Sequence, residues 1–290
     1  LTAPATKRLQ IAYGVIVALL FSIPFHFGPL YSTPEVALVI GNIFAYIVSP
    51  KRKYILTLTK KNQLSSLIHE FAFATDHKVS FLPGQYLEWT LPHENPDTRG
   101  NRRYFTIASS PTEPELHLGV RIQDGGSSFK KKLLTLKEGD HLMAGSLSGE
   151  FTLPKDTTAK LVFIAGGIGV TPFRSMVKYL IDMKEKREVT LFYACANEND
   201  FVYTDLFNQA ASEIGLNTVR VVTDTSKVTE AWKGKTGFIT KDLIAAEVPD
   251  FLTRLYYLSG PDAMVQNYKK MLLSSGVPRT NIKTDYFPGF

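Results

Sequence analysis

The stretch Leu161–Met176, LVFIAGGIGVTPFRSM, limits the possible folds more than any other part of the chain. It begins with an apolar run long enough for a buried strand, passes through three glycines, and ends in a helical pattern. We expect Thr171 to be the N-cap of this helix and Pro172 to stand in its first turn, where the missing N–H costs nothing. Glycines that admit a ligand close to the backbone, followed by free N–H groups at a helix start, predict an anion-binding turn. The glycines are Gly166, Gly167 and Gly169.

The spacing is G-x-G-x-x-P rather than the G-x-G-x-x-G of the dinucleotide fingerprint, so a strand-to-helix turn without a ligand stays open as the alternative. The composition narrows the class. With 290 residues, 44% hydrophobic and 21% charged, the chain has room for about two globular domains. A net charge of +6, with no basic block interleaved with aromatic residues, argues against nucleic acid. Cys195 is the only cysteine, which excludes a disulfide framework and cysteine-ligated zinc or iron–sulfur sites within this chain, and we expect no metal site.

Two apolar segments near the start predict a membrane hairpin over residues 1–50. Leu9–Phe27 carries no formal charge over 19 residues, about the length of a bilayer core. Val36–Val48 is shorter, and a re-entrant segment or a core helix is an alternative for it. Basic residues flank the pair at positions 7–8 and 51–53, whereas the connector has none. The positive-inside rule therefore places both ends in the cytoplasm and the chain in the inner (plasma) membrane, with the rest of the chain cytoplasmic.

A signal peptide is the competing interpretation of the first segment, with Lys7 and Arg8 as its basic region. No small-residue cleavage site follows cleanly, and a second apolar segment comes soon after, which favours the hairpin. A membrane haem would need a pair of histidines, and the second segment has none, so we interpret His26 as an interface residue. The chain begins at Leu1, which suggests a piece of a longer protein.

Residues 51–156 are predicted to form a small antiparallel β-barrel, because short strand-like runs alternate with polar turns. The runs are Tyr54–Leu58, Glu70–Ala74, Tyr86–Leu91, Tyr104–Ala108 and Leu116–Arg121. A helix is expected at Phe129–Leu136. The turn ahead of it, Gly125 to Ser128, is a second glycine–serine turn into a helix start, for which an ordinary N-cap is the alternative.

Residues 157–290 alternate between strand and helix patterns, which predicts a parallel sheet covered by helices on both faces. The expected strands are Leu161–Ala165, Val189–Ala194, Thr218–Thr223 and Arg254–Ser259. The expected helices are Thr171–Lys184, Tyr203–Ile214, Lys241–Ala246 and Asp262–Ser275. Ligands of such sheets bind at the carboxyl ends of the strands, where Gly166–Thr171 and Ser259-Gly260-Pro261 lie.

Five motifs, in this order over residues 54–290, resemble those of the ferredoxin–NADP reductase family. Their matches are Arg103–Ser109 to the flavin motif R-x-Y-[ST]-x-x-S, Gly126–Ser128 to the pyrophosphate-binding turn, Gly167–Pro172 to the G-x-G-x-x-P nicotinamide nucleotide turn, Ser259–Met264 to the C-G-P-x-x-M element, and Asp285–Phe290 to the aromatic end near the flavin. The resemblance implies an FAD-binding barrel, a nucleotide-binding domain, and hydride transfer from NAD(P)H to FAD followed by release of single electrons.

The resemblance also implies which residues bind FAD. Arg103 would pair with the pyrophosphate, as suits its planar fork of donors, and Thr106 would meet the flavin near its reactive nitrogen. Phe105 replaces the family's usual tyrosine, which keeps ring stacking but loses a hydroxyl hydrogen bond. The full FAD set is Arg103, Tyr104, Phe105, Thr106, Gly125, Gly126, Ser127, Ser128 and Phe287.

The nucleotide and catalytic residues follow in the same way. Ser259 stands beside the nicotinamide, where many relatives carry cysteine, and Phe287 would cover the flavin face; with Thr106 they are the expected catalytic residues. The expected nicotinamide nucleotide set is Gly166, Gly167, Gly169, Thr171, Pro172, Glu198, Gly260 and Pro261. NADH is expected over NADPH, because Glu198 and Asp200 stand where a 2′-phosphate would come. Lys233 or Lys235 from a distant loop could still supply a positive charge.

The first 50 residues resemble the last two helices of the FMN-carrying membrane subunits of the sodium-pumping NADH:quinone oxidoreductase. An FMN would then lie upstream of Leu1. The first interpretation is a membrane-tethered NADH dehydrogenase with FAD, whose one-electron acceptor is an upstream membrane flavin, a quinone or a redox protein. The alternatives are a haem-linked ferric-reductase-like enzyme and a non-catalytic docking module that keeps the fold.

Overall fold

The computed structural model describes residues 41–44, 53–123 and 125–287, with side chains given as far as Asp285. The chain divides into two compact units, Leu1–Arg52 and Lys53–Phe290. In the first unit only a helical turn at residues 41–44 is described. The predicted span Leu9–Phe27 and most of Val36–Val48 therefore lie outside the described residues. None of the helices in the described ranges is long and apolar enough to cross a bilayer.

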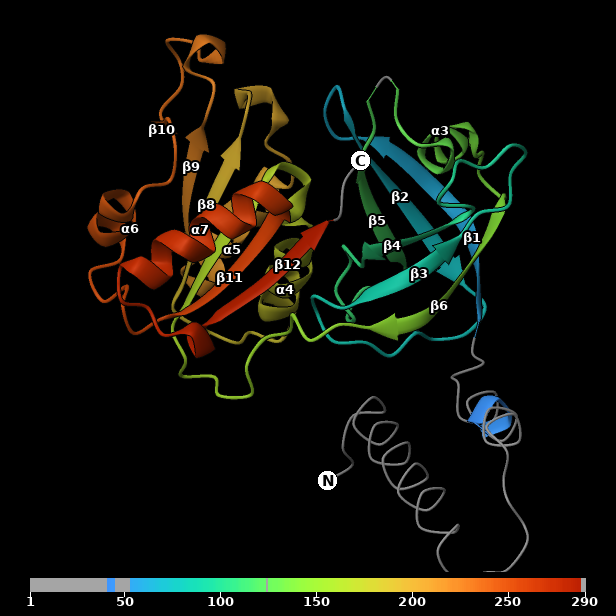
Figure 1. The fold of residues 1–290 in the computed structure, drawn as a ribbon, viewed down its shortest axis with the longest axis horizontal. Coiled ribbons are helices and arrows are strands. Elements are labelled where there is room, and N and C mark those ends of the chain that lie inside the picture. The colour runs from blue at the N-terminus through green and yellow to red at the C-terminus, as the bar shows by residue number, and fades with distance from the viewer. Residues whose placement is uncertain (1–40, 45–52, 124, 288–290) are drawn as a thin grey trace, which may run out of the picture. The chain divides into compact units, whose positions relative to one another are not determined.

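The first half of the second unit is an antiparallel sheet that curls into a partial barrel (Figure 1). Its strands are β1 (Tyr54–Gln63), β2 (Ile68–Thr75), β3 (Tyr86–Thr90), β4 (Arg102–Thr106), β5 (Leu116–Arg121) and β6 (His141–Ser148), in the order β4-β3-β6-β1-β2-β5. Side chains alternate along them, so Leu56 and Leu58 point into the core while Ile55 is half exposed. The core centres on Trp89, whose ring lies 5.6 Å from that of Phe73.

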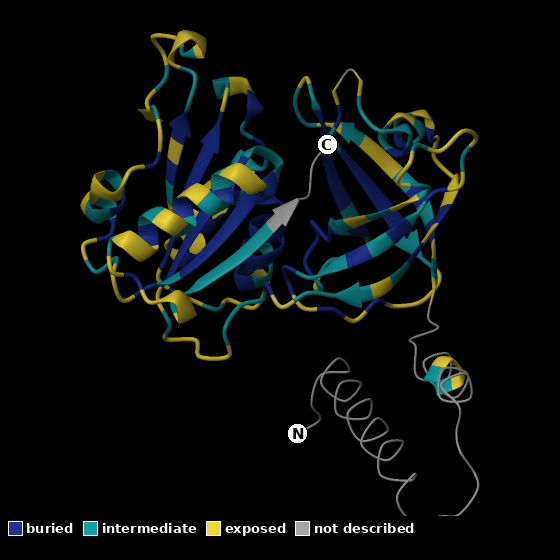
Figure 2. Cartoon of the chain, viewed as in Figure 1, coloured by how far each residue is buried: buried dark blue, intermediate teal, exposed yellow. Residues whose placement is uncertain are grey.

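The second half is a fully parallel sheet between two helical layers (Figure 2). Its strands are β7 (Leu161–Gly166), β8 (Val189–Cys195), β9 (Asn217–Val222), β10 (Lys235–Thr236), β11 (Leu255–Pro261) and β12 (Ile282–Phe287), in the order β10-β9-β8-β7-β11-β12. Its helices are α4 (Thr171–Asp182), α5 (Thr204–Ile214), α6 (Lys241–Glu247) and α7 (Asp262–Ser274). Strand β7 is buried on both faces: Phe163 packs with α4 and α5, and Ile164 packs with α6 and α7.

The order of the strands fixes where a ligand can bind. From β7 the chain moves outward through β8 to β10, then returns to place β11 and β12 on the other side of β7. Ala165 of β7 pairs with Ser259 of β11, so both predicted turns leave neighbouring strand ends. A reversal of this kind leaves a crevice at the carboxyl ends of the two central strands.

Three sequence predictions differ from the structure. Thr171 is not the N-cap: the glycine segment Gly167–Val170 is itself a turn of 3-10 helix, so Thr171 is already helical and Val170 precedes the α-helix. The helix α4 ends at Asp182 rather than Lys184, because Lys184 takes a left-handed φ of 53°. The sequence also missed β6, β10 and β12. In β12 (IKTDYF) the apolar and polar residues follow no core pattern, since it is the edge strand of the sheet.

Candidate functional site

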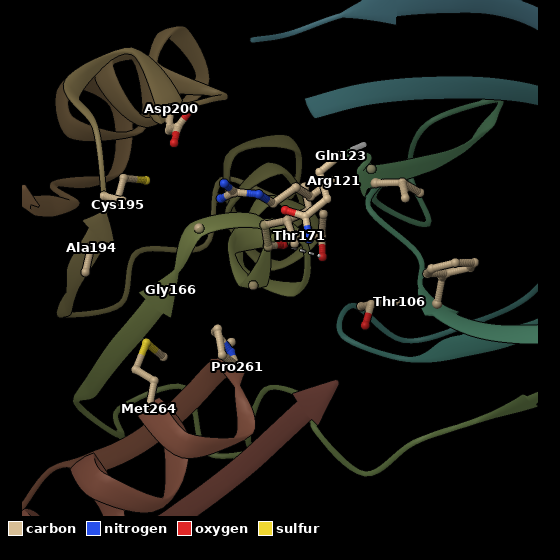
Figure 3. A pocket seen from close by; sticks show the side chains of 18 of the residues that line it. Thr106, Arg121, Gln123, Gly166, Thr171, Ala194, Cys195, Asp200, Pro261 and Met264 are labelled. Carbon is tan, nitrogen blue, oxygen red and sulfur yellow. Dashed lines mark hydrogen bonds between the residues drawn. The ribbon is translucent and has the colours of Figure 1, made fainter. Parts of the chain in front are cut away.

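One cleft of about 640 Å³ lies between the carboxyl ends of the parallel strands and strands β4 and β5 of the partial barrel (Figure 3). The parallel-sheet half contributes residues 166–169, Thr171, residues 194–196, Asp200, Thr223, Phe238, Gly260, Pro261, Met264 and Tyr268. The barrel half contributes Arg99, residues 102–106, residues 119–121, Gln123, Ser127 and Lys130. The cleft therefore joins the predicted flavin motif to the predicted nucleotide turn.

The glycine turn between β7 and α4 is packed so closely that only glycine fits at two of its positions. A Cβ on Gly169 would lie 2.4 Å from the carbonyl oxygen of Ser259, and one on Gly166 would lie 2.3 Å from the sulfur of Met264. Gly167 adopts a φ of 53°. Close packing of this turn against β11 leaves the cleft open above it, with the first N–H groups of the helical segment at its wall.

The flavin motif lies on β4, at the edge of the barrel nearest the cleft. Thr106 is buried at the end of this strand, and its hydroxyl donates a 3.4 Å hydrogen bond to Asp285 of β12. Burial of Asp285 raises the pKa of its carboxyl to about 6, although the Thr106 hydrogen bond acts in the opposite direction. The Phe105 ring packs 5.7 Å from that of Phe129 in α3 (Ser128–Thr135). The C-terminal strand thus brings a carboxyl group against the flavin motif.

Arg103 is bound by the loop that precedes it. Its Nη2 donates to both carboxylate oxygens of Asp97, at 2.7 and 2.9 Å, and its Nη1 donates to three backbone carbonyls of residues 99–102. The same Asp97 carboxylate accepts from the backbone N–H of Ser128 at the start of α3, at 3.2 Å. Burial alone would raise the pKa of Asp97, but the Arg99 amide and the Arg103 guanidinium outweigh it and hold the value at about 2. The two expected pyrophosphate donors therefore already converge on one anion.

The barrel wall of the cleft is strongly basic. Its basic residues are Arg99, Arg102, Arg103, Arg121 and Lys130. Burial and then the charges of Arg99 and Arg121 lower the pKa of Lys130, which shows how closely these cations are gathered. Arg121 reaches from β5 toward the glycine turn, where its Nη1 lies 3.9 Å from a Cβ position on Gly167 (Figure 3). The wall contributed by the parallel sheet has no basic residue among its described members and one acidic residue, Asp200.

Most predicted site residues line the cleft, but several do not. Ser259 is fully buried beneath the turn, and its hydroxyl has no hydrogen-bond partner among the described residues. The Glu198 carboxylate accepts from the amide and hydroxyl of Thr229, at 3.3 and 3.2 Å, and only its neighbour Asp200 reaches the cleft. The predicted residues that lie behind the lining are Pro172, Gly125, Gly126 and Ser128. The backbone of Phe287 pairs with Pro261, while its side chain lies outside the described part of the structure.

Several cleft residues were missed by the sequence analysis, most notably Arg121, Lys130, Phe238 and Met264. Arg121 ends a predicted strand at the edge of a turn, so its position gave a usable signal. Phe238 is 72% exposed although it is a large apolar residue, and an isolated Gly-Phe pair in a loop carries no pattern. Met264 lies in the predicted S-G-P-x-x-M motif, where its contact with Gly166 explains the fixed spacing.

The site has the features that two nucleotides require. Buried Arg103 keeps a side-chain N–H, at Nε, without a partner among the described residues, beside a helix start and a cluster of cations. Such donors bind a pyrophosphate. The glycine turn offers a second backbone approach on the opposite wall. FAD at the first position and a nicotinamide nucleotide at the second would meet beside Thr106, Gly260 and Pro261.

Two family models match the chain, one for each half. Residues 55–152 match the oxidoreductase FAD-binding domain, and residues 163–270 match the oxidoreductase NAD-binding domain. Among curated proteins, the glycine betaine monooxygenase reductase subunit of Pseudomonas aeruginosa is 25% identical over 223 residues, which cover 76% of this chain and 60% of that protein. In the Na(+)-translocating NADH-quinone reductase of Neisseria meningitidis, one component protein is 35% identical over 202 residues, covering 64% of this chain and 49% of that component.

Solved structures match the same region. A cytochrome P450 reductase from Amycolatopsis superposes with a TM-score of 0.72 at 26% identity, covering 81% of this chain and 70% of that one. The FAD/NAD-binding domain of a Vibrio cholerae nitric oxide dioxygenase gives a TM-score of 0.71 at 20% identity, over 81% of this chain and 98% of that domain. The chain spans about three fifths of the first curated relatives that it matches.

Proposed function

The chain is an FAD- and NAD-binding oxidoreductase module of the ferredoxin–NADP reductase type, and from this premise we propose that it oxidises NADH and passes the electrons singly to an acceptor in or at a membrane. The named relatives serve a monooxygenase and a quinone reductase. The acceptor of this chain is accordingly a one-electron partner such as a redox protein, an upstream membrane flavin or a quinone.

The observation that supports this function best is the single cleft shared by both halves. FAD, when bound, accepts a hydride and supplies the change from two-electron to one-electron chemistry. The chain's own residues bind and orient: Arg103 and the start of α3 hold the pyrophosphate side, and Thr106 fixes the end of the flavin motif. The glycine turn and Pro261 hold the nicotinamide nucleotide on the facing wall. Closely apposed walls of this kind lower a barrier chiefly by orientation.

Anaerobic titration tests this function directly. The flavin-loaded protein would be titrated with NADH while the flavin absorbance is recorded. Bleaching by one equivalent of NADH per flavin is expected. A protein that takes up no flavin would support the docking module instead, and one that binds flavin but is not bleached by NADH or NADPH would contradict the proposed reaction.

The choice of NADH follows from the asymmetry of charge in the cleft. All five basic lining residues lie on the barrel side, whereas Asp200 stands on the nucleotide side. Neither candidate lysine lines the cleft, and Lys235 instead pairs with Glu247 at 3.5 Å. A 2′-phosphate would meet a carboxylate, so we expect NADH to be favoured over NADPH by at least about tenfold in kcat/KM, or about 1.4 kcal/mol. Steady-state reduction of ferricyanide with each nucleotide measures the ratio, and equal efficiencies would contradict it.

Attachment to the inner membrane is proposed from the sequence, because Leu9–Phe27 is uncharged and basic clusters flank the two apolar segments. The test uses single cysteines at Tyr31 and Thr57 and a membrane-impermeant thiol reagent on intact cells. The native Cys195 is buried and gives a low background. Labelling at position 31 alone is expected. Labelling of position 57 from outside would overturn the orientation.

A further inference from the structure

A buried polar junction ties the flavin motif to the helix that follows the nucleotide turn. Arg174 lies in the first turns of α4, three residues after Thr171 of the cleft wall. Its Nη1 donates to the carbonyl oxygen of Ala108, at 3.2 Å, and to Oε2 of Glu113, while its Nη2 donates to Oε1 of Glu113 at 2.8 Å. Both acceptors belong to the segment that leaves β4 just after Thr106. The guanidinium therefore spans the two halves of the module.

The neighbouring contacts make this segment rigid. Ser175 donates to the carbonyl oxygen of Ser109 at 2.6 Å, and the backbone N–H of Ser110 donates to Oε2 of Glu113, also at 2.6 Å. All three serines are completely buried. Residues 108–113 are thus bonded both to themselves and to α4, with no apolar layer between the strand end and the helix.

A second carboxylate and a strained tyrosine face the same guanidinium. Arg174 lies over the ring of Tyr203, 5.8 Å from its centroid, and the charge of Glu70 acts on it in addition to that of Glu113. Burial would lower the pKa of Arg174, but Glu113 and Glu70 outweigh burial and raise it. Tyr203 keeps a left-handed φ of 60° here, a conformation retained by a bulky residue only where its surroundings enforce it. A Cβ on Gly119 would lie 2.8 Å from the Tyr203 hydroxyl.

We infer that Arg174 is a positioning residue for hydride transfer, which holds the end of the flavin motif in register with the first turn of α4. The inference rests on the proposed function. Through Ala108 and Glu113 it fixes the strand that carries Thr106, and through its own helix it fixes Thr171 and the glycine turn. Reacting atoms must lie about 3–3.5 Å apart, and a shift of about 1 Å can cost about 100-fold in rate. Neither cofactor needs to touch Arg174 for its loss to slow the reaction.

A matched control separates positioning from stability. Arg254 is also buried, at 5% exposure against 9% for Arg174, and it too is paired with two carboxylates, Glu188 and Asp250. It precedes β11 at the opposite end of the sheet from the cleft, and it does not line the cleft. Arg254→Met therefore breaks a comparable buried ion pair without touching the junction.

The experiment compares Arg174→Met, Glu113→Gln and Arg254→Met in the full chain loaded with FAD. Rapid mixing with saturating NADH gives the rate constant for flavin reduction and the long-wavelength absorbance of stacked nicotinamide and flavin. We expect Arg174→Met to lower the rate constant about 10- to 100-fold and to weaken that absorbance, with FAD content and NADH affinity within about threefold of wild type. Glu113→Gln should show a smaller loss of the same kind, and Arg254→Met should lower the melting temperature while keeping the rate.

Hydrogen exchange on the protein without cofactors gives an independent readout. Arg174→Met should raise exchange at residues 108–113, whereas Arg254→Met should leave that segment protected. If Arg174→Met does not fold, Glu113→Gln carries the test, because its amide keeps the length of the side chain. The inference is overturned if the junction variants reduce flavin as fast as Arg254→Met. A wild-type protein that NADH does not reduce would contradict the proposed function instead, and the exchange result would still report on the junction.

Discussion

The cleft has two anion-binding turns that achieve the same chemistry by opposite means. At the turn between β7 and α4 the wall is backbone, and glycines at positions 166 and 169 are required by contacts as short as 2.3–2.4 Å. At the start of α3 the donors are largely side chains, and Asp97 already satisfies two of them, Arg103 and the Ser128 amide. The first turn is selected by space and the second by charge, so substitutions should damage them in different ways.

The largest expected effect comes from filling the first turn. A methyl group at position 169 would meet the backbone of Ser259 and Gly260, which no side-chain rotation can relieve. Gly169→Ala should weaken NADH binding by about 100-fold or more while FAD stays bound, since overpacking of a tight site costs about 1–3 kcal/mol or more. Fluorescence titration measures both affinities. Gly215→Ala, at the end of α5 with open space around it, controls for general destabilisation. Unchanged NADH affinity in Gly169→Ala would show that the turn does not contact the nucleotide.

The next effect is expected at the charge-built turn. Arg103→Ala removes the guanidinium, and each lost charge-assisted hydrogen bond costs about 1.5–3 kcal/mol, so FAD affinity should fall by about 10- to 100-fold or more. NADH affinity should change far less. Equilibrium dialysis of FAD measures the loss, with Arg279→Ala, outside the cleft, as the control. Retention of flavin at wild-type affinity in Arg103→Ala would remove this residue from the site.

A pH effect is expected where β12 meets the flavin motif. The pKa of Asp285 is about 6 in the folded protein against 3.8 ordinarily, so the folded state binds this proton more tightly than the unfolded state. Stability contributed by the protonated form is therefore present below about pH 4 and is lost as the pH rises to about 6. Asp285→Asn should be more stable than wild type at pH 8, by on the order of 2 kcal/mol, and show little gain at pH 4. Urea unfolding of the FAD-free protein at the two pH values checks this, and a gain of equal size at both would rule out the carboxyl as the cause.

The smallest effect tests whether Asp97 competes with the cofactor. Its carboxylate occupies the donors that a pyrophosphate would use, so Asp97→Asn should bind FAD about threefold to tenfold more tightly, the range of one modest polar contact. Association of FAD, followed by quenching of its fluorescence, should also be faster. Asp156→Asn, a surface carboxylate at the other side of the module, serves as the control. Weaker FAD binding in Asp97→Asn would mean that this residue orients Arg103 instead of blocking it.

The sequence by itself determined the alternation of elements and the chemical type of the main turns. The apolar run before Gly166, the glycines and the helix pattern after Thr171 depend on local periodicity and backbone freedom, which are written in neighbouring residues. The helix α3 and strand β5 were likewise placed to within one residue, because their apolar spacing is regular. The same local rules explain the error at Thr171, since a 3-10 turn and an N-cap have nearly the same sequence signal.

The tertiary structure alone decided which distant residues share the cleft. Asp285 meets Thr106 across 179 positions because β12 joins the edge of the sheet, and Arg174 meets Glu113 across 61. Asp97 fills the donors of Arg103, and Ser259 is buried beneath the turn instead of facing it. Contacts of this kind depend on strand order and on the packing of the two halves, which bring together residues whose separation along the chain carries no periodic signal.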